Sequence, residues 1–188
     1  FKKTKLSPSD LSAVAISEGP GSYTGLRIGV SAAKGICFPL NIPLIALDTM
    51  HILARKIECS EGYIVPAIDA RRDEIYFAMF QSNNCKIPEL KVKTDTMILS
   101  SDSFSNYYET STVNFVGDCN KKIMQYLNHE NIFFSDYILP SANEMGILSH
   151  SKYVKEQFVD VAEFQPKYLK EFGGKKINRS EEHTSELQ

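Results

Sequence analysis

The chain has 188 residues, 43% of them hydrophobic, and its 21 basic and 23 acidic residues give a formal net charge of −2. This length is enough for one or two modest cores, and the balanced charge excludes the basic footprint of a protein that binds nucleic acid tightly on its own. The four cysteines are too widely spaced for a CxxC pair and no apolar run approaches the roughly 18 residues of a membrane span, so we expect a reduced, cytoplasmic protein without membrane association.

The first predicted elements enclose a glycine-rich turn. Residues 11–17 are apolar and β-branched enough for a buried strand, and residues 26–38 have a helical periodicity that we expect to end before Pro39. Between them residues 19–25 read GPGSYTG. Glycines let a backbone approach an anion, and a helix N-terminus offers free N–H groups. The candidate phosphate-loop residues are therefore Gly19, Gly21, Ser22, Thr24 and Gly25.

This loop does not match the two commonest nucleotide fingerprints. A P-loop has lysine and then serine or threonine after its last glycine, whereas Gly25 is followed by Leu26 and Arg27. A dinucleotide fingerprint would need a small residue at Thr24, and the glycine comes one position later. The spacing therefore leaves two interpretations open, a degenerate phosphate site and a plain turn between strand and helix.

The helix after the loop is apolar on most of its surface. Its first face consists of Leu26, Val30, Ala33 and Cys37, and the neighbouring face carries the small residues Gly29, Ala32 and Gly35. Such a helix must pack against more than its own sheet. Its neighbour could be another helix of the same lobe or a helix of a partner subunit. The candidate interface residues are Arg27, Gly29, Ala32, Ala33 and Ile36.

The remaining elements alternate in an α/β manner. A strand at 43–48 and a helix at 49–58, capped by Asp48 or Thr49, precede a polar break at 60–62. After the break we expect strands at 63–70, 74–81, 91–99 and 113–116, helices at 101–109, 120–129 and 142–154, and an extended run at 132–139. The strands at 63–70 and 74–81 should lie in the middle of a sheet, because 74–81 is apolar on both faces. Ser141 and Glu144 form a capping-box pattern for the last helix.

Four stretches occur in a characteristic order: SEGPGSYTGLRIGVSAAKG at 17–35, IDARRDEIYFAMF at 68–80, FVGD at 115–118 and QPKYLK at 165–170. Together they resemble the signature of the TsaB (YeaZ) family. The resemblance implies an actin/sugar-kinase-like (ASKHA) α/β fold with two ribonuclease-H-like lobes. Residues 1–60 would be the remainder of a first lobe that lacks its opening strands and helix, residues 61–172 a second lobe, and residues 173–188 a disordered, non-native tail.

The resemblance also implies a function. The chain would be a non-catalytic partner subunit that pairs with a TsaD-like subunit. Together with a TsaE-like ATPase, it would support the transfer of a threonylcarbamoyl group to the adenosine next to the anticodon of tRNA. It would bind tRNA only through the complex, and ATP and metal would be bound by the partner subunits rather than by this chain. Homodimerisation is a further expectation that the resemblance leaves open.

A turn in the second lobe carries the other candidate residues, Asp69, Arg71 and Arg72. Sugar kinases and actin-like ATPases have a carboxylate followed by glycine at such a strand end, whereas Ala70 follows Asp69 here. Without that glycine the backbone cannot close around a phosphate, although the arginines could hold an anion. We expect Asp69 and Arg71 to organise the hairpin or a partner contact rather than to catalyse.

Two other functions stay open on the residues alone. One is a small-molecule kinase or ATPase that uses the GPGSYTG loop directly, and the other is a homodimeric scaffold without a role on tRNA. The missing lysine after Gly25 and the missing glycine after Asp69 count against the kinase. The four histidines are isolated in the sequence, and no serine lies in a GxSxG context, so we assign no metal ligand and no catalytic residue.

Overall fold

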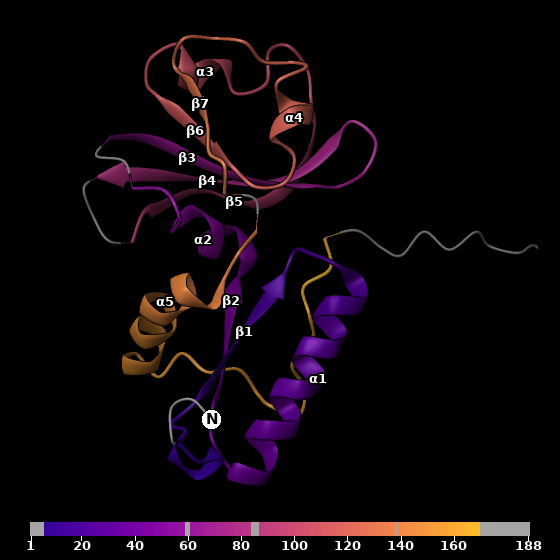
Figure 1. Ribbon diagram of the computed structural model, residues 1–188, viewed down its shortest axis with the longest axis vertical. Coiled ribbons are helices and arrows are strands. Elements are labelled where there is room, and N and C mark those ends of the chain that lie inside the picture. Colours follow the sequence, from indigo (N-terminus) through magenta and orange to yellow (C-terminus); the bar gives the residue numbers. More distant parts are fainter. Residues whose placement is uncertain (1–5, 59–60, 84–86, 138, 170–188) are drawn as a thin grey trace, which may run out of the picture.

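The computed structural model describes residues 6–58, 61–83, 87–137 and 139–169, so the tail expected at 173–188 lies outside the described residues. The elements, in chain order, are a 3₁₀ turn (Pro8–Asp10), β1 (Val14–Gly19), α1 (Tyr23–Leu40), β2 (Leu44–Asp48), α2 (Thr49–Ala54), β3 (Glu61–Asp69), β4 (Glu74–Asn83), β5 (Glu89–Ile98), α3 (Ser105–Tyr108), β6 (Val113–Val116), α4 (Asn120–Ile123), β7 (Ile132–Phe134) and α5 (Ala142–Val154). They form two α/β lobes, one above the other in Figure 1, with α2 between them.

The first lobe is built on the parallel pair β1 and β2. Because successive side chains of a strand point to opposite faces, each face of this pair has its own cover. Leu44 lies on the face covered by Ala33 and Cys37 of α1. Ile45 lies on the other face, which Leu148 of α5 covers. With both faces covered, the first four residues of β2 are buried, as the apolar run in the sequence predicts.

The second lobe is a five-stranded sheet in the order β5-β4-β3-β6-β7. Strands β5, β4 and β3 pair antiparallel, whereas β6 and β7 continue the sheet in parallel with β3. The helical segments around α3 and α4 cover one face and α2 covers the other. The expectation that the strands at 63–70 and 74–81 lie in the interior of a covered sheet is therefore confirmed.

Helix α2 joins the two lobes through buried side chains. Met50, Leu53 and Ala54 have no exposed surface and pack against the sheet of the second lobe. Ile52, on the opposite side of the helix, packs with Ile45 of the first lobe. Asp48 caps α2 as predicted, because its carboxylate accepts a hydrogen bond from the backbone N–H of Met50 at 2.8 Å.

The last part of the described chain, from α5 onward, returns to the first lobe, which corrects the expected second lobe at 61–172. Helix α5 packs on β2, and the segment that follows it runs along β2 and α1 (Figure 1). The backbone N–H of Val159 donates to the carbonyl oxygen of Leu44 at 2.9 Å, and Lys34 of α1 donates to the carbonyl oxygen of Ala162 at 2.7 Å. The physical reason is that both faces of β2 are apolar and α1 covers only one of them. We call residues 159–168 the C-terminal segment.

Helix lengths differ from the sequence expectations. Ser22 caps α1, so the helix begins at Tyr23, and it includes Pro39 because that residue lies in the final turn, before Asn41 ends the helix in a left-handed conformation. The helices expected at 49–58, 101–109 and 120–129 are shorter; the last of these continues to Leu127 as turns. The capping box is also wrong in detail, since the Ser141 hydroxyl donates to the Glu144 carboxylate instead of accepting from its backbone.

Candidate functional site

The glycine loop, residues 19–25, lies against the C-terminal segment. Gly19 has a φ of +111°, and a Cβ atom there would lie 2.8 Å from the carbonyl oxygen of Lys167. The backbone N–H of Lys167 in turn donates to the carbonyl oxygen of Glu18 at 2.7 Å. The close backbone approach that a glycine permits is therefore made here by another segment of the chain, within the loop for which a degenerate phosphate site and a plain turn were both open.

The N-terminus of α1 begins within this loop. The Ser22 hydroxyl accepts a hydrogen bond from the N–H of Gly25 at 3.3 Å, and thereby binds one of the N–H groups that an anion would need. Gly21, Thr24 and Gly25 are exposed. These candidate residues thus lie at the surface, beside a turn that is closed by Gly19 and Lys167.

Two carboxylates lie where β1 and β2 end, next to the loop. Burial and the neighbouring Asp48 raise the pKa of Glu18. Asp48 accepts a hydrogen bond from the Thr94 hydroxyl of the second lobe at 2.7 Å, and its carboxylate lies 3.9 Å from the ammonium of Lys167. Carboxylates repel phosphate, and the nearby ammonium already faces one of them. This end of the sheet therefore carries negative charge that Lys167 offsets in part.

The structure separates the five candidate interface residues of α1. Ala33 is buried in the core of the first lobe, and a Cβ atom on Gly29 would lie 3.1 Å from the Ile16 side chain of β1. Both residues contact their own sheet, and the expectation that Ala33 contacts a partner is corrected because it is buried. Ala32 and Ile36 lie on the opposite, exposed side. We call that side the outer face of α1; it comprises Gly25, Ile28, Ala32, Gly35, Ile36 and Pro39, all exposed.

Arg27 lies on the flank of α1 that faces the C-terminal segment and contacts two tyrosines. Its Nε donates to the Tyr168 hydroxyl at 3.1 Å, and its guanidinium lies 4.2 Å from the centre of the Tyr23 ring. The two tyrosine rings are 4.9 Å apart. Arg27 and Tyr168 are both exposed. They are in contact although 141 positions separate them in the sequence. We call these three residues the Tyr23–Arg27–Tyr168 cluster.

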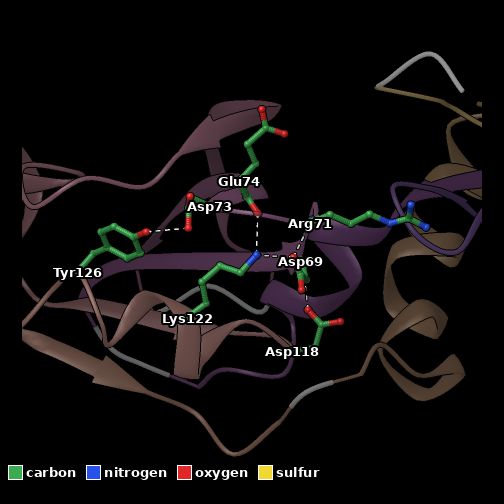
Figure 2. Close-up of polar contacts among 7 residues, drawn as sticks. All are labelled: Asp69, Arg71, Asp73, Glu74, Asp118, Lys122 and Tyr126. Carbon is green, nitrogen blue, oxygen red and sulfur yellow. Dashed lines mark hydrogen bonds and ion pairs between the residues drawn. The ribbon is translucent and has the colours of Figure 1, made fainter. Parts of the chain in front are cut away.

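The hairpin between β3 and β4 is braced by a polar cluster (Figure 2). The Asp69 carboxylate accepts a hydrogen bond from the N–H of Arg71 at 2.7 Å and forms an ion pair with Lys122. Lys122 also donates to the carbonyl oxygen of Glu74 at 3.1 Å, and Asp118 accepts from the N–H of Asp69 at 2.9 Å. The hydrogen bond from Lys122 is the main reason that the pKa of Asp69 is lowered. Asp69 therefore organises the hairpin.

The two arginines of this turn adopt left-handed backbone conformations, with φ of +71° at Arg71 and +51° at Arg72. Both are exposed, and Figure 2 shows the Arg71 side chain extending away from the polar cluster. A left-handed conformation is uncommon for residues other than glycine, and here the contacts of Asp69 with Lys122 and with the Arg71 N–H support it. The hairpin contacts lie within the second lobe, whereas the glycine loop contacts the C-terminal segment.

The glycine–aspartate turn after β6 packs against β3. Gly117 has a φ of +138°, and a Cβ atom there would overlap the carbonyl oxygen of Ala67. Its neighbour Asp118 binds the N–H of Asp69. The turn therefore holds the end of β6 against β3.

The sequence did not predict that Glu18, Lys167 and Tyr168 lie next to the glycine loop and the start of α1. The only signal was the QPKYLK stretch, which resembles a family motif but carries no pattern that indicates what it touches. Its partners are brought close only by the return of the chain to the first lobe.

Within the part of the chain that the structure describes, no group of three or more His, Cys, Asp or Glu side chains could hold a metal ion. Burial raises the pKa of the Cys119 thiol to about 12, which keeps it protonated at neutral pH. None of the described helices is long and apolar enough to cross a membrane.

Residues 1–176 match the family described as TsaD, tRNA N6-adenosine threonylcarbamoyltransferase. Among curated proteins, the "tRNA threonylcarbamoyladenosine biosynthesis protein TsaB" of Bacillus subtilis is 37% identical over 93 residues, which are 50% of this chain and 41% of that protein. The protein of the same name from Haemophilus influenzae is 27% identical over 177 residues, 86% of this chain and 71% of that protein. The matched region thus spans less than half of the first relative and about seven tenths of the second.

A solved structure described as YeaZ from Pseudomonas aeruginosa superimposes with a TM-score of 0.77 at 22% sequence identity, over 89% of this chain and 78% of that one. The likeness shows the fold, which is the actin-like, two-lobe α/β fold that the sequence motifs imply.

Proposed function

The chain belongs to the family described as TsaD, tRNA N6-adenosine threonylcarbamoyltransferase, and within it to the TsaB (YeaZ) group, and on this basis we propose that it is a partner subunit rather than the catalyst of threonylcarbamoyl transfer to tRNA. It pairs with a TsaD-like subunit, and the threonylcarbamoyl group is transferred to the adenosine next to the anticodon. The names of its curated relatives favour this role over that of a small-molecule kinase.

The observation that carries the proposal is the outer face of α1. Ile28 is 65% exposed and Ile36 is 37% exposed, and the small residues Ala32 and Gly35 lie between them. Apolar side chains at helical spacing are normally covered, and small residues allow another helix to approach closely. A helix of the TsaD-like subunit is the proposed occupant of this face.

The glycine loop supports the non-catalytic part of the proposal. Its close backbone approach is used by Lys167, and the carboxylates of Glu18 and Asp48 lie beside it. A kinase or ATPase would need this region for the phosphates of its nucleotide. We therefore propose that ATP and metal are bound by the partner subunits, the TsaE-like ATPase among them, and that this chain meets tRNA only within the complex, in the cytoplasm where tRNA is found.

The test uses two matched glycines on exposed helix surfaces. A Cβ atom would meet nothing within 4 Å at Gly35 on α1, and the same holds at Gly146 on α5. The chain, extended to the length of its relatives, is co-purified with its own TsaD-like protein and analysed by light scattering. We expect a one-to-one complex. Gly35→Leu should weaken pairing at least about tenfold, because a bulky side chain then separates the helices, whereas Gly146→Leu should pair normally.

Two results would contradict the proposal. One is the absence of any complex with the TsaD-like protein, combined with ATP turnover by the isolated chain. The other is equal pairing of the Gly35→Leu and Gly146→Leu variants, which would show that the outer face of α1 is not the contact. A homodimer that persists when the TsaD-like protein is added would favour the scaffold without a role on tRNA.

A further inference from the structure

The turn between β3 and β4 has an unusual pair of residues at its tip. Arg71 and Arg72 follow one another in left-handed conformations, with φ of +71° and +51°. Hairpin turns that need such conformations normally have asparagine or glycine, because a Cβ atom crowds the backbone there. Glycine would fit both positions with less strain, so the path of the backbone does not explain the two arginines. Strain of this kind points to a use for the side chains.

The contacts that brace the turn do not involve either guanidinium. The Asp69 carboxylate accepts a hydrogen bond from the backbone N–H of Arg71 and forms an ion pair with Lys122. The backbone N–H of Ala70 donates to the carbonyl oxygen of Glu74 at 3.2 Å. All the contacts that Arg71 makes here are made by its backbone, and a glycine at this position would keep them.

The carboxylates nearest to the arginines are engaged elsewhere. Asp69 is bound to Lys122, and Asp73 accepts a hydrogen bond from the Tyr126 hydroxyl at 2.9 Å. Neither guanidinium of the turn forms an ion pair or a hydrogen bond with the described residues, and Figure 2 shows the Arg71 side chain extending away from the polar cluster. Each guanidinium therefore keeps its five N–H groups for a ligand outside this chain.

We propose that Arg71 and Arg72 bind phosphates of the tRNA backbone in the complex with the TsaD-like subunit. This inference rests on the proposed function, in which the chain meets tRNA within that complex, and it names the residues that make the contact. A guanidinium binds a phosphate through two parallel hydrogen bonds, and contacts of this kind position a nucleic acid without reading its sequence. Two such contacts are weak on their own, which agrees with the chain's net charge of −2.

The place of the turn favours tRNA over the partner protein as the ligand. The outer face of α1, the proposed contact with the TsaD-like subunit, belongs to the first lobe, whereas the turn belongs to the second lobe, beyond α2 (Figure 1). The exposed residues of the turn, Asp69 and residues 71–73, are all charged. Protein interfaces have an apolar centre, whereas interfaces with nucleic acids are more polar and rich in positive charge.

The experiment removes both side chains and keeps the backbone conformation. The chain, extended to the length of its relatives, is purified with its TsaD-like subunit, and binding of an unmodified tRNA transcript is measured from about 50 to 200 mM salt. In the double variant Arg71→Gly, Arg72→Gly we expect affinity to fall at least about tenfold and the slope of log K against log salt to decrease by about 2. The melting temperature should not fall, because glycine relaxes a left-handed backbone.

Two controls separate charge from backbone strain. Glu156 is also exposed and left-handed, with φ of +52°, and it follows α5 in the first lobe. Glu156→Gly therefore relaxes the backbone without removing a cation, and it should leave tRNA binding unchanged. The double variant Arg71→Lys, Arg72→Lys keeps both positive charges and should retain most of the salt dependence.

Two results would overturn this inference. One is unchanged affinity and salt dependence in the double glycine variant, which would make the arginines part of the turn alone. The other is loss of pairing with the TsaD-like subunit in that variant, which would assign the arginines to carboxylates of that protein. In both cases a complex of the unaltered chain that depends on Gly35 would leave the proposed function standing. Absence of pairing by the unaltered chain would overturn both.

Discussion

The ion pair between Lys56 and Glu144 connects the end of α2 to the start of α5. The ammonium and the carboxylate are 3.2 Å apart, and both side chains are only 13% exposed. The Ser141 hydroxyl donates to the same carboxylate. Glu144 also lies in the first turn of α5, where a negative charge is favoured by the helix dipole. We therefore expect Glu144→Gln to destabilise the packing of α5 on the first lobe.

The magnitude follows from the pKa of Glu144. Burial alone would raise this pKa, but the hydrogen bonds from Ser141 and Lys56 lower it from 4.5 to about 2. This difference corresponds to at most roughly 3.4 kcal/mol, and screening by nearby solvent reduces it to about 1–2 kcal/mol. Because the pKa is lowered in the folded state, the contribution is present above pH 4.5 and is lost as the pH falls toward 2.

The assay is urea unfolding of the unaltered chain and of Glu144→Gln, from pH 7 down to pH 3. At pH 7 the variant should lose about 1–2 kcal/mol of unfolding free energy, and the difference should shrink as the pH falls because the glutamate itself becomes protonated. Glu130→Gln is the control, since Glu130 is exposed and forms no ion pair within the described residues. A difference that stays the same across this pH range would refute the reasoning.

Two further predictions concern Gly117 and Cys119. Gly117→Ala should lower the free energy of unfolding by about 3 kcal/mol or more, because φ is +138° and the new methyl group would overlap the Ala67 carbonyl. A thermal melt measures this loss. Gly146→Ala is the control: its methyl group would lie in open space, and the variant should stabilise α5 by about 0.5–1 kcal/mol. An unchanged melting temperature for Gly117→Ala would contradict the packing argument. Cys119 is buried and its thiol has a pKa of about 12, so it should resist thiol reagents at pH 8 in the folded chain and react in denaturant. Mass spectrometry identifies which cysteine has been modified. Rapid modification of Cys119 in the folded chain would contradict its burial.

Local patterns predicted most elements of the fold. The apolar run at 43–48 and the strand at 113–116 are found as β2 and β6, and α5 has the bounds expected from the capping pattern of Ser141 and Glu144. Their signals lie within the segment itself, as alternation, apolar runs or a residue that can cap a helix. The short helices α3 and α4 were overestimated, because periodicity does not show where i→i−3 bonds replace the helix.

The arrangement of the elements was predictable only in part. The two-lobe architecture follows from the family motifs, whereas the position of α5 does not follow from its sequence. Leu148 needs a core, but either lobe could provide it, and the choice depends on which sheet face is still uncovered. The pairing of Val159 with Leu44 is likewise a contact between distant segments, for which a single sequence holds no local signal.

The glycine positions explain why the candidate loop was recognisable from the sequence although its contacts were not. A glycine with positive φ indicates that something approaches the backbone closely, but not what approaches. At Gly19 it is Lys167, at Gly62 it is Thr112 and at Gly117 it is Ala67, each a residue of this chain. The fold therefore requires Gly19, because a Cβ atom there would lie 2.8 Å from the carbonyl oxygen of Lys167 and would displace that residue. By this reasoning the packing of the chain on itself is sufficient to require the glycine at the end of β1.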